Sequence, residues 1–177
     1  MIQTNSGIKL LLYKYTPIIL LFVSILNEID FNNLEFKYFS FNFSYILIFY
    51  YSLRRTDCLG YTSIFIAGLF NDVIVGVPMG ISSLSYLLLC AATSYLRNIT
   101  LRPNIFKDWI FFLLTISFLN FLSFIVLMLI FKFEVSYFNQ IINIIFTFLL
   151  YLFFSYLFNF YDNTLLGKFN GKWKFQH

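Results

Sequence analysis

Long apolar runs, separated by short polar turns, dominate the chain. Clear examples are 17–26, 45–53, 110–131 and 141–160. A helix that crosses a bilayer needs about 20 mostly apolar residues. Lipid offers no partner to free backbone N–H and C=O groups, so a spanning segment is expected to be helical, because a helix satisfies those groups internally. The pattern therefore predicts an all-α, polytopic membrane protein.

The turns between the apolar runs divide the chain into six predicted helices. The links at 54–58 and 76–80 are short enough to allow only hairpin reversals. No linker, repeat or additional soluble segment interrupts the pattern, so we expect one integral membrane domain over residues 1–177. The predicted spans are approximately 10–27, 36–53, 59–75, 81–97, 109–131 and 136–160.

The basic residues predict how these helices are oriented. With the N-terminus in the cytoplasm, ten of the twelve Lys and Arg residues fall on that side, including Arg54 and Arg55 in one short turn. Only Lys37 and Lys132 fall on the opposite side. Cytoplasmic loops of membrane proteins carry such an excess of basic residues. We therefore expect both termini to be cytoplasmic.

Composition narrows the function classes. Hydrophobic residues make up 60% of the chain and charged residues 11%, with a mean hydropathy of +0.79; soluble domains carry about 25% charged residues. The net charge of +4 is explained by insertion next to anionic lipids rather than by nucleic acid. Cys58 and Cys90 do not form a disulfide framework, and the single histidine is His177. We expect no metal and no cofactor.

One stretch combines charge and flexibility in an otherwise oily chain. Residues 68–80, GLFNDVIVGVPMG, contain an aspartate, three glycines and a proline. Spacing by four places Ile64 and Asp72 on one stripe of the third helix. Asp72 either sits at the water interface beside a turn, or lies partly buried and holds the third and fourth helices, or a partner, in one geometry. Small residues on the same face predict close helix packing: Gly60, Ser63, Ala67 and Gly68.

The remainder of this stretch predicts a tight turn. Gly76 and Gly80 can adopt backbone angles that other residues resist. Pro78 fixes one backbone angle and is expected to stop the third helix. Ser82 and Ser83 follow at the start of the fourth helix, where their side-chain oxygens are expected to accept from free N–H groups.

Other polar residues do not form a catalytic arrangement. No histidine is available to activate a nucleophile, the carboxylates are dispersed among separate turns, and 76–80 lacks the lysine of a phosphate-binding loop. We expect no enzyme. Trp109, at a span end, is expected to anchor in the headgroup region. Hydrogen bonds between helices are expected from polar residues of the last two spans: Ser117, Asn120, Ser123, Asn139, Asn143, Thr147, Ser155 and Asn159.

The stretch 68–80, followed by Leu84, Tyr86 and Leu87, resembles the signature of the MreD family, a G-L-x-x-D-x-x-x-G-x-P-x-G hairpin leading into a helix. The preceding 50–55 is similar to the family's aromatic helix end and basic turn, although Arg55 is followed by Thr-Asp where the family has proline. The close likeness covers about 47–97. The family comprises rod-shape-determining proteins of the bacterial inner membrane. It is similar in fold to the substrate-binding subunits of energy-coupling-type vitamin transporters.

The resemblance implies a non-enzymatic role in cell-shape maintenance and lateral peptidoglycan synthesis. The implied partners are an MreC-like single-span protein, an MreB-like cytoskeleton and cell-wall synthases, besides the membrane lipids. Gly68, Asp72, Gly76, Pro78 and Gly80 would set the shape of the partner-binding hairpin. The alternative is a small-molecule-binding subunit of a membrane transporter, in which Asp72 and a few serines of the fourth helix would line a pocket.

Overall fold

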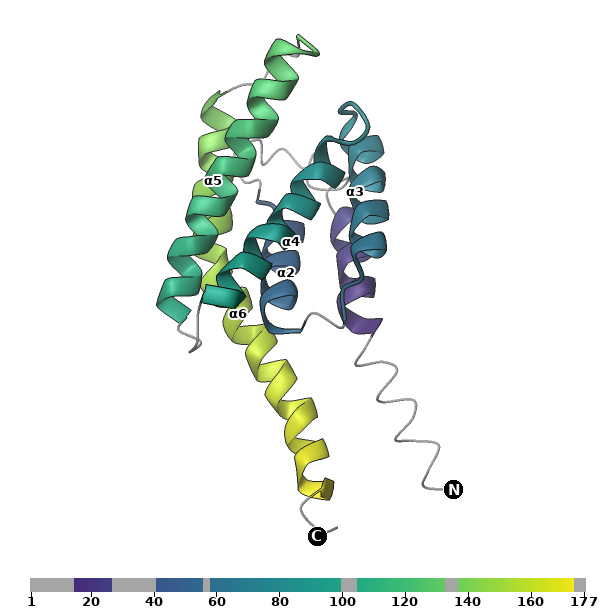
Figure 1. Cartoon of the computed structure of the whole chain (residues 1–177), viewed down its shortest axis with the longest axis vertical. Helices are drawn as coiled ribbons and strands as arrows, with labels where there is room; N and C mark the ends of the chain where they lie inside the picture. Colours follow the sequence, from purple (N-terminus) through teal and green to yellow (C-terminus); the bar gives the residue numbers. More distant parts are fainter. Residues whose placement is uncertain (1–14, 27–40, 56–57, 100–104, 133–136, 174–177) are drawn as a thin grey trace.

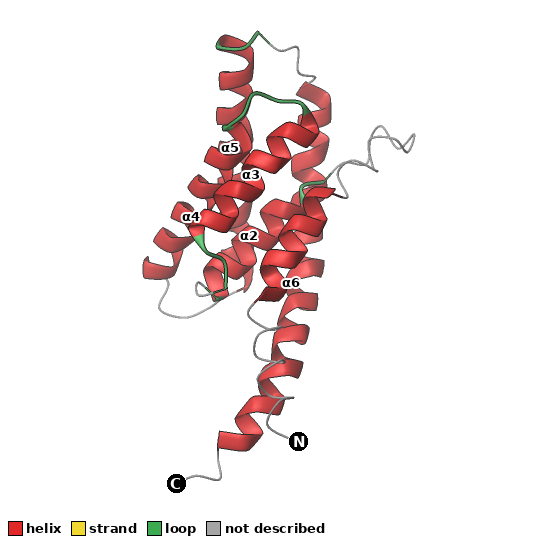
Figure 2. Cartoon of the chain, turned by 90° about the vertical axis from the view of Figure 1, so that its right-hand side faces the viewer, coloured by secondary structure: helices red, strands yellow, loops and turns green. Residues whose placement is uncertain are grey.

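The described part of the chain folds into six helical segments, as its apolar pattern predicts. The computed structural model describes residues 15–26, 41–55, 58–99, 105–132 and 137–173, and the side chains of the last helix over 138–162. Within these residues there is no strand (Figures 1 and 2). The helices are Tyr15–Leu26, α2 (Phe43–Arg54), α3 (Tyr61–Val75), α4 (Ile81–Ile99), α5 (Ile105–Leu129) and α6 (Tyr137–Trp173).

The short helix α2 forms the centre of the molecule. Nine of its twelve residues are buried, and it contacts both α4 and α6. Phe49 packs edge-on against Phe112 of α5 and Tyr151 of α6, with ring centroids 4.9 and 5.6 Å apart. Its twelve residues extend only about 18 Å. Helix α2 therefore begins at Phe43, later than the start of the predicted span 36–53, of which residues 36–40 lie outside the described residues.

The last two helices depart from their predicted bounds. Helix α5 begins at Ile105 rather than 109, and α6 continues to Trp173 rather than ending near 160. No proline interrupts 161–173, so the backbone hydrogen-bond ladder can continue. The extension projects beyond the other helices at the lower end of Figure 1. The predicted sixth span, 136–160, matches the apolar segment Phe138–Asp162, and the helix continues beyond it because falling hydropathy ends a membrane segment without ending a helix.

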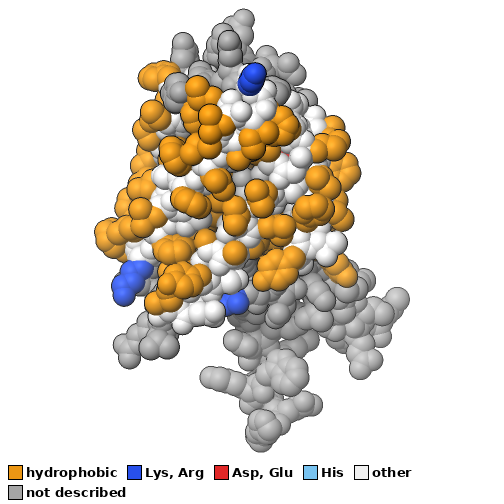
Figure 3. Space-filling view, turned by 45° about the horizontal axis from the view of Figure 1, so that its top comes forward, with side chains coloured by type: hydrophobic (Ala, Val, Ile, Leu, Met, Phe, Trp, Pro, Cys, Tyr) orange, Lys and Arg blue, Asp and Glu red, His pale blue; other side chains and the backbone are white. Residues whose placement is uncertain are grey.

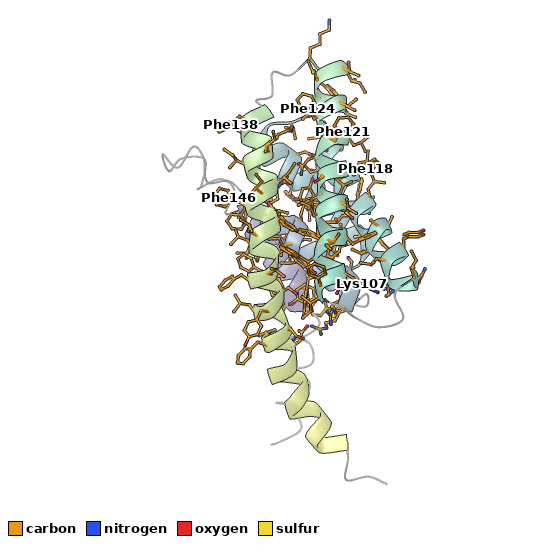
Figure 4. All side chains as sticks on the ribbon, turned by 90° about the vertical axis from the view of Figure 1, so that its left-hand side faces the viewer. Lys107, Phe118, Phe121, Phe124, Phe138 and Phe146 are labelled. Carbon is orange, nitrogen blue, oxygen red and sulfur yellow. The ribbon has the colours of Figure 1, made fainter. Side chains whose placement is uncertain are left out.

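Apolar side chains cover the outside of the bundle, and many polar ones lie inside. Residues 105–129 and 138–162 are each long and apolar enough to cross a membrane, yet only 28% and 22% of their most apolar windows are buried. Core helices of a soluble protein would instead be mostly buried. On the face in Figure 3, apolar side chains cover the middle and basic ones lie toward the ends. Phe118 and Phe121 of α5 point outward (Figure 4).

The chain reverses direction so that two sets of polar residues lie at opposite ends. The α3–α4 turn, 76–80, lies at the upper end of Figure 1, where α5 also ends. The C-terminal end of α2, with Arg54, and the start of α5 lie at the lower end (Figure 1). These two ends carry the two candidate sites.

Candidate functional site

Asp72 caps helix α4 from the last turn of α3. Its carboxylate is fully buried. Oδ2 accepts from the Gly80 N–H at 2.7 Å, and Oδ1 accepts from the Ser82 N–H at 2.8 Å. These donors belong to the start of α4, where backbone N–H groups have no partner within the helix, and the helix dipole favours a negative charge there. The interpretation in which Asp72 is buried and holds the two helices together is confirmed.

The turn between the two helices is closed by Gly76. Gly76 has φ 75° and ends α3 in the left-handed conformation. The Asp72 carbonyl accepts from the N–H groups of Gly76 at 3.0 Å and Val77 at 3.1 Å. The first is the bond of an αL cap, and the second is the longer bond of a Schellman motif. Gly80, with φ 107°, supplies the second left-handed position. Both glycine predictions are confirmed. Helix α3 ends at Val75 with Gly76 as its C-cap, and Pro78 follows two residues later, where proline is common because it cannot continue a helix.

The serines at the start of α4 do not cap it as predicted. The Ser82 N–H donates to Asp72, and the Ser82 hydroxyl instead accepts from Asn71 Nδ2 at 3.0 Å. The Ser83 hydroxyl is buried without a hydrogen-bond partner. The start of α4 is therefore capped by a carboxylate eight to ten residues earlier in the chain, and not by the local hydroxyls that the sequence suggested.

Gly68 allows α3 and α4 to approach at backbone distance. A Cβ added to Gly68 would lie 2.6 Å from the Ser83 nitrogen and closer still to its Cα. Ala67 is fully buried on the same helix. Gly60 behaves differently: it is exposed at the N-cap of α3, and a Cβ there would meet only Ser63 Oγ at 3.9 Å. The close-packing prediction was therefore wrong for Gly60, because the helix begins there instead of running through it.

A second polar cluster lies at the opposite end of the bundle and joins three helices. Neighbouring arginines of α2 diverge: Arg54 pairs with Asp108 of α5 at 3.3 Å, and Arg55 pairs with Asp162 of α6 at 3.1 Å. The Tyr50 hydroxyl also donates to Asp162 at 3.4 Å. The cluster lies close to the labelled Lys107 in Figure 4. Arg54, which is exposed, and Arg55, which is half-buried, thus each join the end of α2 to a carboxylate of another helix.

These ion pairs were not predicted from the sequence, although the sequence contains a signal for them. The predicted topology already assigned Asp108 and Asp162 to the same side of the membrane as Arg54 and Arg55. Charged groups near spanning segments usually pair with one another, because leaving them unpaired in a poorly hydrated setting is costly. Only the packing of α5 and α6 around α2 decides which carboxylate meets which arginine.

The two ion pairs are expected to differ in their contribution to stability. The Arg55 and Asp162 side chains are 13% and 9% exposed, whereas Arg54 is 31% exposed. Breaking a buried pair costs more than breaking an exposed one, because the remaining charge loses its partner. We expect Arg55→Gln to lower the free energy of unfolding by about 2 kcal/mol and Arg54→Gln by about 1 kcal/mol. Thermal unfolding in detergent measures both, and equal shifts would contradict the assignment.

The sequence predicts that the polar residues of the last two helices bond to neighbouring helices. Only some of them do so. Ser123 of α5 bonds to Ser85 of α4 at 3.1 Å, and Thr147 of α6 accepts from the Asn42 N–H at 3.0 Å. Asn120 donates within its own helix, to the Ile116 carbonyl.

Trp109, for which we expect a place in the headgroup region, joins α5 to α6. The Trp109 ring stacks on Phe148 of α6 with centroids 4.3 Å apart. Its indole N–H donates to the Phe148 carbonyl at 3.0 Å. The ring therefore joins α5 to α6, because the extra turn at the start of α5 moves Trp109 inward from the helix end.

No family model, curated protein or solved structure matches the chain. The functional argument therefore depends on the residues themselves. At the α3–α4 end the polar groups bond to one another and fix a shape; at the α2 end they hold three helices together.

Proposed function

We propose that the chain is a non-enzymatic scaffold of the bacterial cell-elongation complex, inserted in the inner membrane by six helices with both termini in the cytoplasm. The sequence support is the likeness of 68–80 to the MreD signature. An MreC-like single-span protein, an MreB-like cytoskeleton and cell-wall synthases are the partners that this likeness implies.

The observation that carries the proposal is that the hairpin motif specifies one rigid turn. Gly68 allows the close approach of the helices, Asp72 caps α4, and Gly76 and Gly80 take the left-handed positions. The turn presents Met79, 74% exposed, at its apex. A preorganised apolar projection favours protein binding, because little conformational entropy is lost when a partner docks.

The distribution of side chains supports a six-span arrangement. Apolar residues face outward on every described helix except the central α2, and ion pairs lie inside at one end. Helix α4 is about 28 Å long, close to the bilayer core of about 30 Å. Helix α2 is shorter, but protein surrounds it, so its ends need not meet lipid. Membrane lipids would contact the outward faces of the other helices.

The same geometry disfavours the transporter alternative. A pocket on the outer side would need Asp72, Ser82, Ser83 or Ser85 to bind a ligand. Asp72 and Ser82 are bonded within the hairpin, and Ser85 is bonded to Ser123. Ser83 is fully buried against Gly68. Asp72, Ser82 and Ser85 are therefore engaged within the protein, and Ser83 is buried where a solute does not reach it.

The test uses an exposed residue, so that loss of binding cannot be attributed to unfolding. We expect Met79→Gln to insert and unfold normally, but to co-purify with an MreC-like partner in less than about one fifth of the wild-type yield, the effect of one apolar anchor. It should also fail to restore rod shape in cells depleted of the chain. Leu129→Gln is the matched control, since Leu129 is 73% exposed at the same end. Wild-type binding and cell shape with Met79→Gln would refute the proposal.

A further inference from the structure

Three cationic side chains from different helices meet at the end of the bundle opposite the α3–α4 turn. Arg54 ends α2, and its Nη2 lies 3.3 Å from Asp108 Oδ2 at the start of α5. Arg97, in the last turn of α4, reaches back to α2 with Nη1 3.5 Å from the Ser52 carbonyl oxygen. Lys107 directly precedes Asp108 on α5. The ends of α2, α4 and α5 therefore share one basic cluster.

The cations of this cluster retain most of their hydrogen-bonding capacity. Arg54 makes a single-atom contact with Asp108 and remains 31% exposed, while a guanidinium has five N–H donors. Arg97 is exposed and makes one contact at 3.5 Å. Lys107 is exposed, and no polar group of the described residues contacts it. The neighbouring Arg55 and Asp162 neutralise each other. Among the described residues of this cluster, three cations accompany one carboxylate, Asp108, which leaves two positive charges uncompensated.

Exposed apolar side chains border the same cluster. On α4 they are Tyr95 and Ile99, 64% and 58% exposed; on α5 they are Phe106 and Ile110, 61% and 41% exposed. A soluble anion would contact the cations but not these apolar side chains. A lipid with an anionic headgroup would contact both, because its headgroup would meet the cations while its acyl chains lie along α4 and α5.

We propose that the ends of α2, α4 and α5 form a binding site for the phosphate of an acidic phospholipid, with Arg54, Arg97 and Lys107 as its donors. Arginine recognises phosphate with its planar set of N–H groups, and lysine adds a point charge. Basic recesses between the cytoplasmic ends of spanning helices bind anionic headgroups. The proposal requires the chain to lie in a bilayer but does not depend on the scaffold function.

Native mass spectrometry of the full chain, released from detergent micelles containing phosphatidylglycerol or phosphatidylcholine, measures the retained lipid. We expect the wild type to retain phosphatidylglycerol preferentially. Each lost cation should lower its affinity about fivefold, so Arg97→Gln with Lys107→Gln should lower it about 25-fold. Arg97→Lys with Lys107→Arg should retain it, because the charges remain. Lys132→Gln, an exposed cation after α5 at the other end, should have no effect.

Three results would overturn the site. Unchanged phosphatidylglycerol retention in the Arg97→Gln, Lys107→Gln variant would show that the cluster does not bind it. Equal loss in the charge-conserving variant would show that packing, and not charge, retains the lipid. Complete displacement by millimolar inorganic phosphate would indicate a site for a free anion. The lipid measurements are independent of the scaffold proposal: they would stand even if Met79→Gln bound its partner normally.

Discussion

Replacing Gly68 with alanine is expected to lower the free energy of unfolding by about 3 kcal/mol or more. The new Cβ would lie 2.6 Å from the backbone nitrogen of Ser83, and backbone cannot move aside as a flexible side chain can. Overpacking of a core costs about 1–3 kcal/mol when side chains can adjust, and more when they cannot. For a chain of this length that corresponds to a fall of the thermal midpoint by about 6 °C or more, measured by size-exclusion chromatography after heating.

Gly60→Ala is the matched control for this experiment. It makes the same chemical change at the start of the same helix, where the nearest atom is Ser63 Oγ at 3.9 Å. We expect a loss of about 1 kcal/mol or less, since glycine is a better N-cap residue than alanine but no backbone clash arises. If the two alanine variants unfold at the same temperature, α3 and α4 do not approach each other as closely as the geometry indicates.

Removing the Asp72 carboxylate is expected to have the second large effect. Asp72→Ala leaves the N–H groups of Gly80 and Ser82 without their acceptor at a half-buried helix end. Hydrogen bonds to charged groups contribute about 1.5–3 kcal/mol each, so the loss should be about 3–5 kcal/mol. Asp72→Asn keeps one acceptor oxygen but turns an amide N–H₂ toward the other donor, and should fall between the alanine variant and the wild type.

The order of three variants tests this assignment in the same thermal measurement. Ser82→Ala removes only the hydroxyl that accepts from Asn71, and should cost about 1 kcal/mol. We expect the loss of stability to increase from Ser82→Ala through Asp72→Asn to Asp72→Ala. An Asp72→Ala variant as stable as Ser82→Ala would rule out the carboxylate as the cap of α4.

The features that sequence predicted correctly are those with local causes. Six apolar segments give six helices, and the left-handed positions fall on Gly76 and Gly80 because only glycine adopts them without strain. The stripe that includes Ile64 and Asp72 is buried, since residues four apart share a helix face. Each of these follows from a spacing of a few residues along the chain.

The errors arise where distant segments compete with local signals. Ser82 is a good local cap, but the buried carboxylate of Asp72 instead accepts from the N–H groups of Gly80 and Ser82 at the start of α4. The sequence also does not predict that Phe148 of α6 provides Trp109 with both a stacking surface and an acceptor. The pairing of Arg55 with Asp162 joins residues 107 positions apart. Spacing in the sequence does not encode such contacts.

The short central helix α2 has a consequence for how the protein is made. Its two terminal arginines meet their carboxylates 54 and 107 positions later in the chain. In a nascent chain, Arg54 therefore lacks this partner until residue 108 is synthesised, and Arg55 until residue 162. The contacts around α2 are completed only after α6 has been synthesised, and a ribosome stalled before residue 162 would leave Arg55 without Asp162.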